Sequence, residues 1–520
     1  MNEYDLLIVG SGIAGLTAAA RAAEQGLRVC VLTKTPRINQ TNTFYAQGGI
    51  VSTGIDDSTE LLKSDIFHAG SGINYEAAVD ILAAEGPQLV IDYLSEKVGV
   101  PFIRNADGDF DRTKEAAHST RRIIHVTDHT GRAIQEGLAE YIAKKDRITV
   151  LSDMTTIDII TSAHNSVSFQ DRYRKNRALG VYVLNNATGN VEPIFAPTTI
   201  LATGGVGNLF LHTSNPPAAT GDGIAMAYRV GVEILNAEFV QFHPTVLFHR
   251  DIGRFLITES MRGEGGRLKN RDGEYFMNRY SPAQKELAPR DEVARAIYSE
   301  IESDNSAFVL LDATEIKGID LATRFPDIFA TCMKVGIDIR KDLIPVVPAA
   351  HYFCGGIKVD INGATSLDGL YALGETACTG VHGANRLASV SLLEGFYFAT
   401  RAADKIVQDG YELDRDRIGN IPEWVTPKNE FEFDPVLIHS DLLSIRHTMW
   451  NYAGIIRTKG RLERAIADLG YMKHRVDKFY REARVTREII ELRNATVASH
   501  LIARAAYGNN KSIGCHYLRS

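Results

Sequence analysis

The apolar and polar positions near the start of the chain predict a strand, a helix and a second strand. Residues 4–10, YDLLIVG, form an almost continuous apolar run, which is typical of a strand buried on both faces of a sheet. Residues 11–26, SGIAGLTAAARAAEQG, place small and apolar side chains at helical spacing, and residues 27–34, LRVCVLTK, return to a strand pattern. We therefore predict a β-α-β unit at the start of an α/β fold.

The turn between the first strand and the helix carries the pattern G-x-G-x-x-G, with glycines at Gly10, Gly12 and Gly15. The first glycine permits the turn, the second lets backbone approach a pyrophosphate, and the third lets helix and strand pack closely. A purely structural turn is the alternative. The second strand ends in Thr33 and Lys34 instead of the acid that usually binds a ribose, so Lys34 is expected to meet a phosphate or an adenosine edge.

Later segments favour a flavin over a nicotinamide as the rest of the dinucleotide. Residues 197–205, PTTILATGG, and 367–377, LDGLYALGETA, read as strands that run into glycine-rich ends. Asp222 starts a helical pattern, where its carboxylate either caps that helix or binds a cofactor hydroxyl. Residues 385–403 begin another helix, whose N-terminal dipole would stabilise negative charge on a reduced flavin ring.

The last hundred residues have a different pattern. Apolar side chains recur at helical spacing in residues 439–457, 462–472 and 487–508, which predicts a helical bundle. Residues 409–435 have the composition of a linker.

Composition narrows the classes of partner. The 520 residues include 44% hydrophobic residues, enough for several cores, and 57 Lys and Arg against 64 Asp and Glu give a net charge of -7. This balance argues against nucleic acid and against an anionic membrane, and no apolar run is long enough to span one. The five cysteines are scattered without a C-x-x-C pair, so we expect no metal site and a reducing, cytoplasmic location.

Six motifs, in order along nearly the whole chain, resemble the flavoprotein family of succinate dehydrogenase and fumarate reductase, and its L-aspartate oxidase branch most closely. The motifs are NTFYAQGG (42–49), QFHPT (241–245), TESMRGEGG (258–266), PRDEVARAI (289–297), HYFCGGI (351–357) and HGANRLASVSLLE (382–394).

The resemblance implies an architecture and a cofactor. It implies a Rossmann-like FAD-binding domain (1–236 and 352–415), an inserted α+β capping domain (237–351) and a C-terminal helical domain (416–520). FAD would be noncovalent, because Asn42 stands where respiratory relatives carry a histidine that bonds to the flavin. The implied cofactor-binding residues are Gly10, Ser11, Gly12, Ile13, Ala14, Gly15, Lys34, Asn42, Thr43, Phe44, Tyr45, Ala46, Gln47, Gly48, Gly49, Asp222, Glu375, Ser391 and Leu392. Gly48 and Gly49 are expected to allow close approach of the flavin.

The resemblance also supplies candidates for binding a dicarboxylate. His243, His351 and Arg386 match carboxylate-binding positions, and Thr258 matches a further substrate contact. Taken singly, each has a structural alternative, such as an imidazole bonded to backbone or an arginine in an ion pair.

A second group of matched positions concerns the proton that accompanies hydride transfer. Arg290 matches a proton-shuttling arginine, with Glu259 and Arg262 as a relay toward solvent. A guanidinium is a poor base unless neighbours share its proton, so a purely electrostatic role for Arg290 is the alternative.

Glu115 is the candidate that separates aspartate from succinate. It lies in RTKEAAHSTRR (112–122), whose KEAAHS resembles the REGGHS of the oxidases, with two alanines in place of two glycines. A carboxylate there would pair with the substrate ammonium. The alternative is a surface glutamate paired with Arg121 or Arg122.

We therefore expect FAD-dependent oxidation of L-aspartate to iminoaspartate, the first step of NAD biosynthesis, with oxygen or fumarate reoxidising the flavin. Quinolinate synthase is the implied consumer of the product. The alternatives are a soluble fumarate reductase or succinate dehydrogenase flavoprotein acting on related C4-dicarboxylates, and a flavin-binding assembly or sensor protein.

Overall fold

A five-stranded parallel sheet forms the centre of the nucleotide-binding part of the molecule. The computed structural model describes residues 4–115, 117–127, 129–253, 255–427 and 434–519. The sheet runs in the order β17 (Leu370–Ala372), β10 (Thr199–Leu201), β1 (Leu6–Val9), β2 (Val29–Leu32) and β6 (Ile148–Leu151). Every residue of β1 and β2 is buried, as their continuous apolar runs predict. The predicted β-α-β unit is confirmed, with α1 (Ile13–Glu24) connecting the parallel strands β1 and β2.

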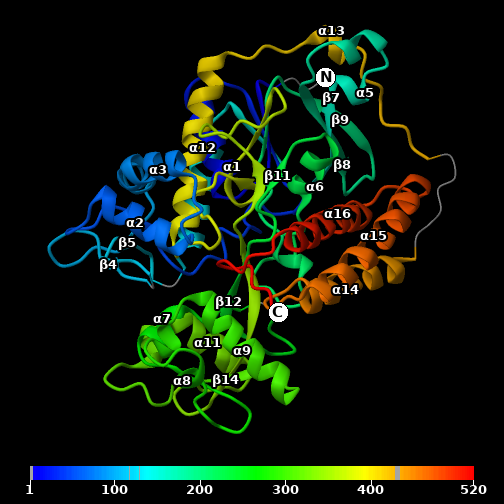
Figure 1. The fold of residues 1–520 in the computed structure, drawn as a ribbon. Helices are drawn as coiled ribbons and strands as arrows, with labels where there is room; N and C mark the ends of the chain where they lie inside the picture. The colour runs from blue at the N-terminus through cyan, green and yellow to red at the C-terminus, as the bar shows by residue number, and fades with distance from the viewer. Residues whose placement is uncertain (1–3, 116, 128, 254, 428–433, 520) are drawn as a thin grey trace.

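Helix α1 is enclosed between the sheet and two further helices. It packs against α12 (Val390–Asp409) and α4 (Thr130–Ala143), and α12 runs beside it in yellow in Figure 1. The small side chains of α1 allow this close packing, and ten of its 12 residues are buried. A Cβ on Gly15 would lie 2.1 Å from the carbonyl oxygen of Gly10, so the third glycine of the motif packs the helix on the first turn as predicted.

Three smaller sheets and several helices flank this core. An antiparallel sheet has the order β7-β8-β9, and two three-stranded sheets have the orders β3-β5-β4 and β11-β16-β18. The strands are β3 (Ile50–Val51), β4 (Arg112–Thr113), β5 (Ile123–Ile124), β7 (Met154–Thr161), β8 (Ala178–Asn185), β9 (Val191–Phe195), β11 (Ile234–Leu235), β16 (Gly356–Lys358) and β18 (Ala377–Cys378). The helices are α2 (Thr59–Ala69), α3 (Glu76–Leu89), a π-helical segment (Val90–Val98), α5 (Ser162–Asn165) and α6 (Asp222–Arg229).

The segment between β12 and β15 forms the lower, green part of the molecule in Figure 1. Its antiparallel sheet has the order β12-β15-β14-β13 and a separate apolar core. The strands are β12 (Val240–Leu247), β13 (Arg267–Lys269), β14 (Val309–Asp312) and β15 (Ile344–Phe353). The helices are α7 (Glu259–Gly263), α8 (Met277–Tyr280), α9 (Arg290–Asp304), α10 (Leu321–Arg324) and α11 (Pro326–Lys334). β12 and β15 pair along their length and join this part to the parallel sheet region.

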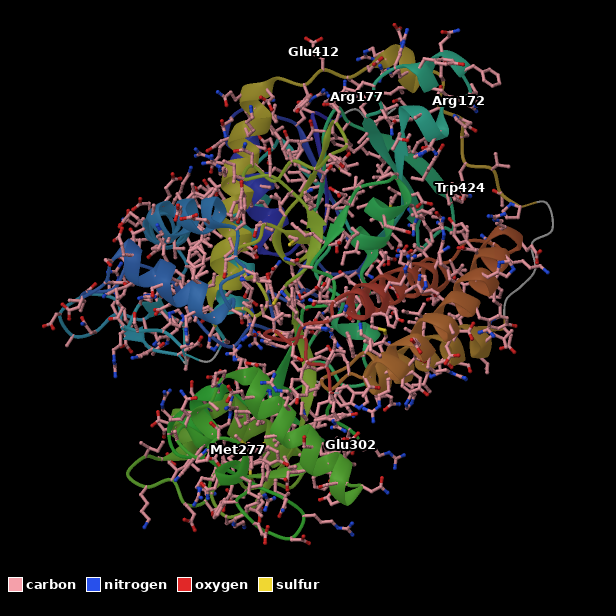
Figure 2. The ribbon with its side chains drawn as sticks, viewed as in Figure 1. Arg172, Arg177, Met277, Glu302, Glu412 and Trp424 are labelled. Carbon is pink, nitrogen blue, oxygen red and sulfur yellow. The ribbon has the colours of Figure 1, made fainter. Side chains whose placement is uncertain are left out.

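The C-terminal residues form the expected helical bundle of α14 (Pro435–Tyr452), α15 (Lys459–Glu482) and α16 (Arg487–Gly508). α16 packs against α14, α15 and α6. The predicted linker is largely irregular and contains the short helix α13 (Arg415–Ile418), while its residues 428–433 lie outside the described residues. Within it, the ring of Trp424, labelled in Figure 2, packs edge-on against Tyr182 of β8. Among the described helices, none is long and apolar enough to cross a membrane.

Candidate active site

One long cavity runs from the glycine turn after β1 to the paired strands β12 and β15. All the predicted site residues except Gly15 and Arg262 line it. Gly15 supports the turn from behind, and Arg262 is buried behind Glu259. The fold therefore brings together side chains that are more than 370 positions apart in the sequence.

The turn after β1 needs glycine for two physical reasons. Gly10 has φ +118°, and a Cβ on it would lie 2.0 Å from the carbonyl oxygen of Ala202 at the end of β10. The first helical amide, Ile13 N, donates to Thr43 Oγ1 at 3.0 Å. The loop at residues 41–49 is thereby tied to the N-terminus of α1, where a pyrophosphate would be bound.

Lys34 and Asp222 form an ion pair at the nucleotide end of the cavity. Lys34 Nζ lies 2.6 Å from Asp222 Oδ2 and 2.8 Å from Glu491 Oε1 of α16. Burial lowers the pKa of Lys34, but the two carboxylates more than offset this and keep that pKa raised. Asp222 makes no helix cap, because the N-cap of α6 is Gly221, so the cap alternative is wrong. Acids of the chain hold Lys34, and its contact with a phosphate or an adenosine edge stays a prediction.

The loop at residues 41–49 presents polar atoms that need partners. Asn42 Nδ2 donates to Glu375 Oε2 at 2.6 Å, while Asn42 Oδ1 and Gln47 Oε1 are buried without a partner among the described residues. Burial raises the pKa of Glu375 to about 7, even though its Oε1 accepts from Phe353 N. Buried amide oxygens without donors are costly, so the loop fits a ligand that supplies hydrogen-bond donors, as the flavin and ribityl groups of FAD do.

Gly48 lies close to another group, but that group is a side chain of the protein. A Cβ on Gly48 would lie 2.9 Å from Glu115 Oε1, and one on Gly49 would lie 2.3 Å from the carbonyl oxygen of Ile124. These glycines therefore make room for Glu115 and β5. We predicted that they allow close approach of the flavin and did not anticipate these two contacts within the protein.

His243 and His351 face each other from the paired strands β12 and β15, with ring centroids 5.3 Å apart. His243 Nδ1 accepts from Thr245 N at 3.2 Å, and His351 Nδ1 lies 2.7 Å from Ser214 Oγ. Burial and the charges of Arg290 and Arg386 hold the pKa of both imidazoles well below the usual value. The histidines are therefore neutral hydrogen-bonding groups, so among the three predicted carboxylate-binding residues the positive charge comes from Arg386.

Arg386 supplies a buried positive charge beside the histidines. Its Nε donates to Gln241 Oε1 at 3.2 Å, its Nη1 donates to Ser391 Oγ at 2.9 Å, and the guanidinium lies 4.7 Å from the centre of the Tyr352 ring. Burial and the nearby Arg290 lower its pKa. Among the described residues no carboxylate lies within ion-pair distance of Arg386, so an anionic ligand would complete the site.

Arg290 and Glu259 form the second charged group of the site. Arg290 Nε lies 2.6 Å from Glu259 Oε2. Burial lowers the pKa of Arg290, but Glu259 and Glu115 more than offset this and raise it above the ordinary value. Burial raises the pKa of Glu259, and the charges of Arg290 and Arg262 bring it below normal.

The predicted relay is interrupted at Arg262. Its Nη2 lies 3.9 Å from Glu259 Oε2, too far for a hydrogen bond, and its Nη1 donates to the carbonyl oxygen of Glu286. Arg262 is also fully buried, so in this structure the relay does not reach solvent there. This corrects the expected continuous path.

Thr258 and Glu115 both line the cavity. Thr258 is the N-cap residue of α7, and its side chain makes no capping bond. Glu115 Oε2 accepts from Ser389 Oγ at 2.7 Å, and burial raises the pKa of this carboxyl. The surface-pair alternative for Glu115 is wrong, because its carboxyl lines the cavity and accepts from Ser389, while Arg122 pairs with Asp57 and Asp65.

The loop that carries Glu115 is held by groups that the sequence reading did not single out. His118 Nε2 lies 2.9 Å from the carbonyl oxygen of Ala388, beside Ser389. Ala117 has φ +64°, a conformation that favours glycine, as the resembling REGGHS motif has there, and Ala116 lies outside the described residues.

The cavity is also lined by other residues that the prediction missed: Thr33, Thr35, Gln40, Thr41, His129, Arg132, Met154, Thr155, Thr156, Thr203, Ser214, Asn215, Met226, Phe255, Leu256, Asp327, Tyr352 and Ser389. Ser389 was within reach of the sequence, since it lies inside the quoted motif 382–394.

Known proteins resemble this chain in sequence and in fold. Residues 5–392 match the FAD binding domain family model. The chain is 42% identical over 519 residues to an L-aspartate oxidase of Acinetobacter baylyi, covering 99% of this chain and 93% of the relative. It is 41% identical over 525 residues to the L-aspartate oxidase of Pseudomonas aeruginosa, covering 99% and 95%. A solved quinol fumarate reductase structure from E. coli matches with a TM-score of 0.87 and 27% identity, covering 100% of this chain and 91% of that chain.

The parallel sheet, the glycine turn and the long cavity define an FAD-dependent flavoprotein of the class that includes fumarate reductase. Sequence identity near 40% to L-aspartate oxidases, over 99% of the chain, narrows this class to one family. The chain belongs to the L-aspartate oxidase family.

Proposed function

We propose that this protein oxidises L-aspartate to iminoaspartate in an FAD-dependent reaction, the first step of de novo NAD biosynthesis. The observation that carries the proposal is the arrangement of Arg386, Arg290 and Glu115 in one cavity. Two guanidinium groups suit two substrate carboxylates, and a carboxylate suits the substrate ammonium. Relatives named L-aspartate oxidase support it.

The residues of the chain would bind and orient the substrate. Arg386 and the neutral rings of His243 and His351 would hold one carboxylate, and Thr258 with Arg290 would hold the other. FAD, when bound, supplies the acceptor for the hydride that leaves Cα. Glu115 would fix the amine, which places Cα at one position relative to the cofactor.

Arg290 acts electrostatically in aspartate oxidation under this proposal. The ammonium must first lose a proton, and Glu115, whose pKa is raised by burial, would accept it. Hydride can then leave Cα as the lone pair of the neutral amine forms the C=N bond, so no carbon acid is deprotonated. The raised pKa of Arg290 and the 3.9 Å separation between Glu259 and Arg262 support this role. Reduction of fumarate is different, because it requires a proton at carbon, and Arg290 would supply it.

The remaining partners complete the proposal. Oxygen or fumarate would reoxidise the flavin, and quinolinate synthase would consume the unstable iminoaspartate. We propose a cytoplasmic location. We also propose three domains, with FAD bound by residues 1–236 and 352–415, a cap at 237–351 and a helical domain at 416–520.

A soluble fumarate reductase flavoprotein is the second candidate, favoured by the likeness to the quinol fumarate reductase structure. A substrate panel distinguishes the two. Under anaerobic conditions, aspartate should bleach the flavin absorbance of the purified protein, and air or fumarate should restore it. Bleaching by succinate but not by aspartate would overturn the proposal in favour of the second candidate.

A further inference from the structure

The C-terminal helix α16 reaches the nucleotide end of the cavity through a buried polar cluster. Glu491 of α16 and Asp222 of α6 both pair with Lys34, at 2.8 and 2.6 Å. The side chains of Lys34, Asp222 and Glu491 are only 14%, 10% and 15% exposed. Lys34 and Asp222 line the cavity, and Glu491 lies behind them.

A second residue of α16 fixes the other side of the Asp222 carboxylate. The amide Nδ2 of Asn494 donates to Asp222 Oδ1 at 2.9 Å, and Asn494 Oδ1 accepts from Arg229 Nη1 at 2.8 Å. Asn494 is fully buried, so its orientation is fixed by these two bonds. Both oxygens of Asp222 are therefore held, one by Lys34 and one by α16.

The side chain of Arg487 joins α16 to the same cluster. Arg487 Nη1 donates to the carbonyl oxygen of Lys34 at 3.1 Å, and Arg487 Nε pairs with Glu491 at 3.0 Å. A Cβ on Gly221 would lie 2.9 Å from the Cβ of Ala498, so α16 packs directly on the start of α6. In Figure 1, α16 in red runs beside α6.

This arrangement supplies a carboxylate that is missing at the end of β2. In dinucleotide-binding folds an acid at the end of the second strand binds the adenosine ribose, but here Thr33 and Lys34 occupy that place. Asp222 brings a carboxylate there from another segment, and Glu491, which pairs with both Lys34 and Arg487, holds the Lys34 ammonium as a second carboxylate.

We propose that Glu491 and Asn494 are positioning residues that hold Lys34 and Asp222 for the adenosine half of FAD, so that the C-terminal helices take part in retaining the cofactor. The inference rests on the proposed function only in requiring FAD in the cavity. Failure of aspartate to bleach a protein that binds FAD would sink the proposed function and leave this inference testable.

The test is the FAD dissociation constant of the full chain, measured by equilibrium dialysis of the holoprotein. Glu491→Gln removes the charge and keeps the shape, and we expect about tenfold weaker binding, the loss typical of one charge-assisted contact. Glu491→Asp should fall between this variant and the wild type. The matched control is Glu488→Gln, which removes the same charge from an exposed position of α16 and should bind FAD like the wild type.

Coupling to Lys34 separates positioning from general stability. In a Lys34→Met background, Glu491→Gln should weaken FAD binding by less than twofold, because its partner is gone. A tenfold effect in both backgrounds would overturn the inference. So would a lower melting temperature of Glu491→Gln with an unchanged dissociation constant, which is the result for a merely structural residue.

Discussion

At the scale of single residues, we propose that the choice between aspartate and succinate depends on Glu115. Its carboxylate is held by Ser389 and faces a cavity that also contains Arg290 and Arg386. Succinate lacks the ammonium group that would pair with this buried acid, so it would leave the acid unpaired.

Glu115→Gln should therefore lower kcat/KM for aspartate by about tenfold to a hundredfold and leave fumarate reduction nearly unchanged. Steady-state rates with both substrates measure this. Glu60→Gln, which neutralises an exposed acid on α2, serves as the control. An unchanged ratio of aspartate to succinate turnover in Glu115→Gln would show that another group recognises the amine.

Glu375 gives the site a pH dependence that can be isolated. Its pKa is raised from 4.5 to about 7 by burial. A carboxyl with a raised pKa in the folded chain contributes stability that is complete below the unfolded value and is lost as the pH rises through about 7. Gln mimics the protonated form at every pH.

Glu375→Gln without FAD should therefore melt like the wild type near pH 4.5 and at a higher temperature at pH 8. Melting curves at these two pH values check the sign. Glu412→Gln removes the same charge from an exposed position outside the cavity, and Glu412 is labelled in Figure 2. The melting temperature of this variant should differ from that of the wild type by the same amount at both pH values. A Glu375→Gln profile parallel to the wild type would contradict the assignment.

Asn42 is the residue from which we predict that FAD is bound noncovalently. Its amide donates to Glu375, and an amide has no nucleophilic ring nitrogen to bond with the flavin methyl. Acid precipitation of the holoprotein should therefore release all flavin absorbance into the supernatant. Flavin that remains with the protein pellet would refute noncovalent binding.

At the scale of elements, the packing of α1 on the turn after β1 leaves no room for a side chain at Gly15. A Cβ on Gly15 would lie 2.1 Å from the carbonyl oxygen of Gly10, and backbone cannot give way as a flexible side chain can. Gly15→Ala should thus destabilise the protein by about 3 kcal/mol and lower the amount of FAD bound per chain.

The matched change is Gly460→Ala in α15, where the added Cβ would meet nothing within 4 Å. It should raise stability by about 0.5–1 kcal/mol, since alanine is the better helix former. Melting temperature and flavin content of the purified variants provide both measurements. Equal behaviour of the two variants would show that the packing at Gly15 is not limiting.

At the scale of the whole molecule, the site exists only where two separate parts of the fold meet. Arg386 comes from the region of the parallel sheet, whereas Thr258, Glu259 and Arg290 come from the lower sheet region, which β12 and β15 connect to it. Glu302 at the end of α9 accepts from Arg461 and Arg519, so the helix that begins with Arg290 also contacts the C-terminal region (Figure 2). A dicarboxylate that bridges the parts should stabilise the whole chain.

Succinate at about 100 times its dissociation constant should add roughly 2.7 kcal/mol of stability. The resulting rise in melting temperature should disappear in Arg386→Met and persist in Lys405→Met, which removes a positive charge from α12 outside the cavity. Calorimetry of the holoprotein measures both. A rise that survives in Arg386→Met would place the carboxylate elsewhere.

The sequence by itself determined the local features of this protein. Continuous apolar runs placed β1 and β2, glycine spacing placed the turn at Gly10, and helical spacing predicted the C-terminal bundle. These features depend on neighbours a few residues apart, so periodicity and turn chemistry are sufficient to predict them. The motifs and the glycine turn also supplied many of the residues that line the cavity, though fewer than half of them.

Only the tertiary structure decided the charges and contacts between distant segments. Burial beside Arg290 and Arg386 makes His243 and His351 neutral, and a 3.9 Å separation interrupts the relay at Arg262. The pairing of Lys34 with Glu491 joins residues 457 positions apart. A pKa or an ion pair depends on everything packed around a group, and that environment is assembled from segments whose proximity no local pattern encodes.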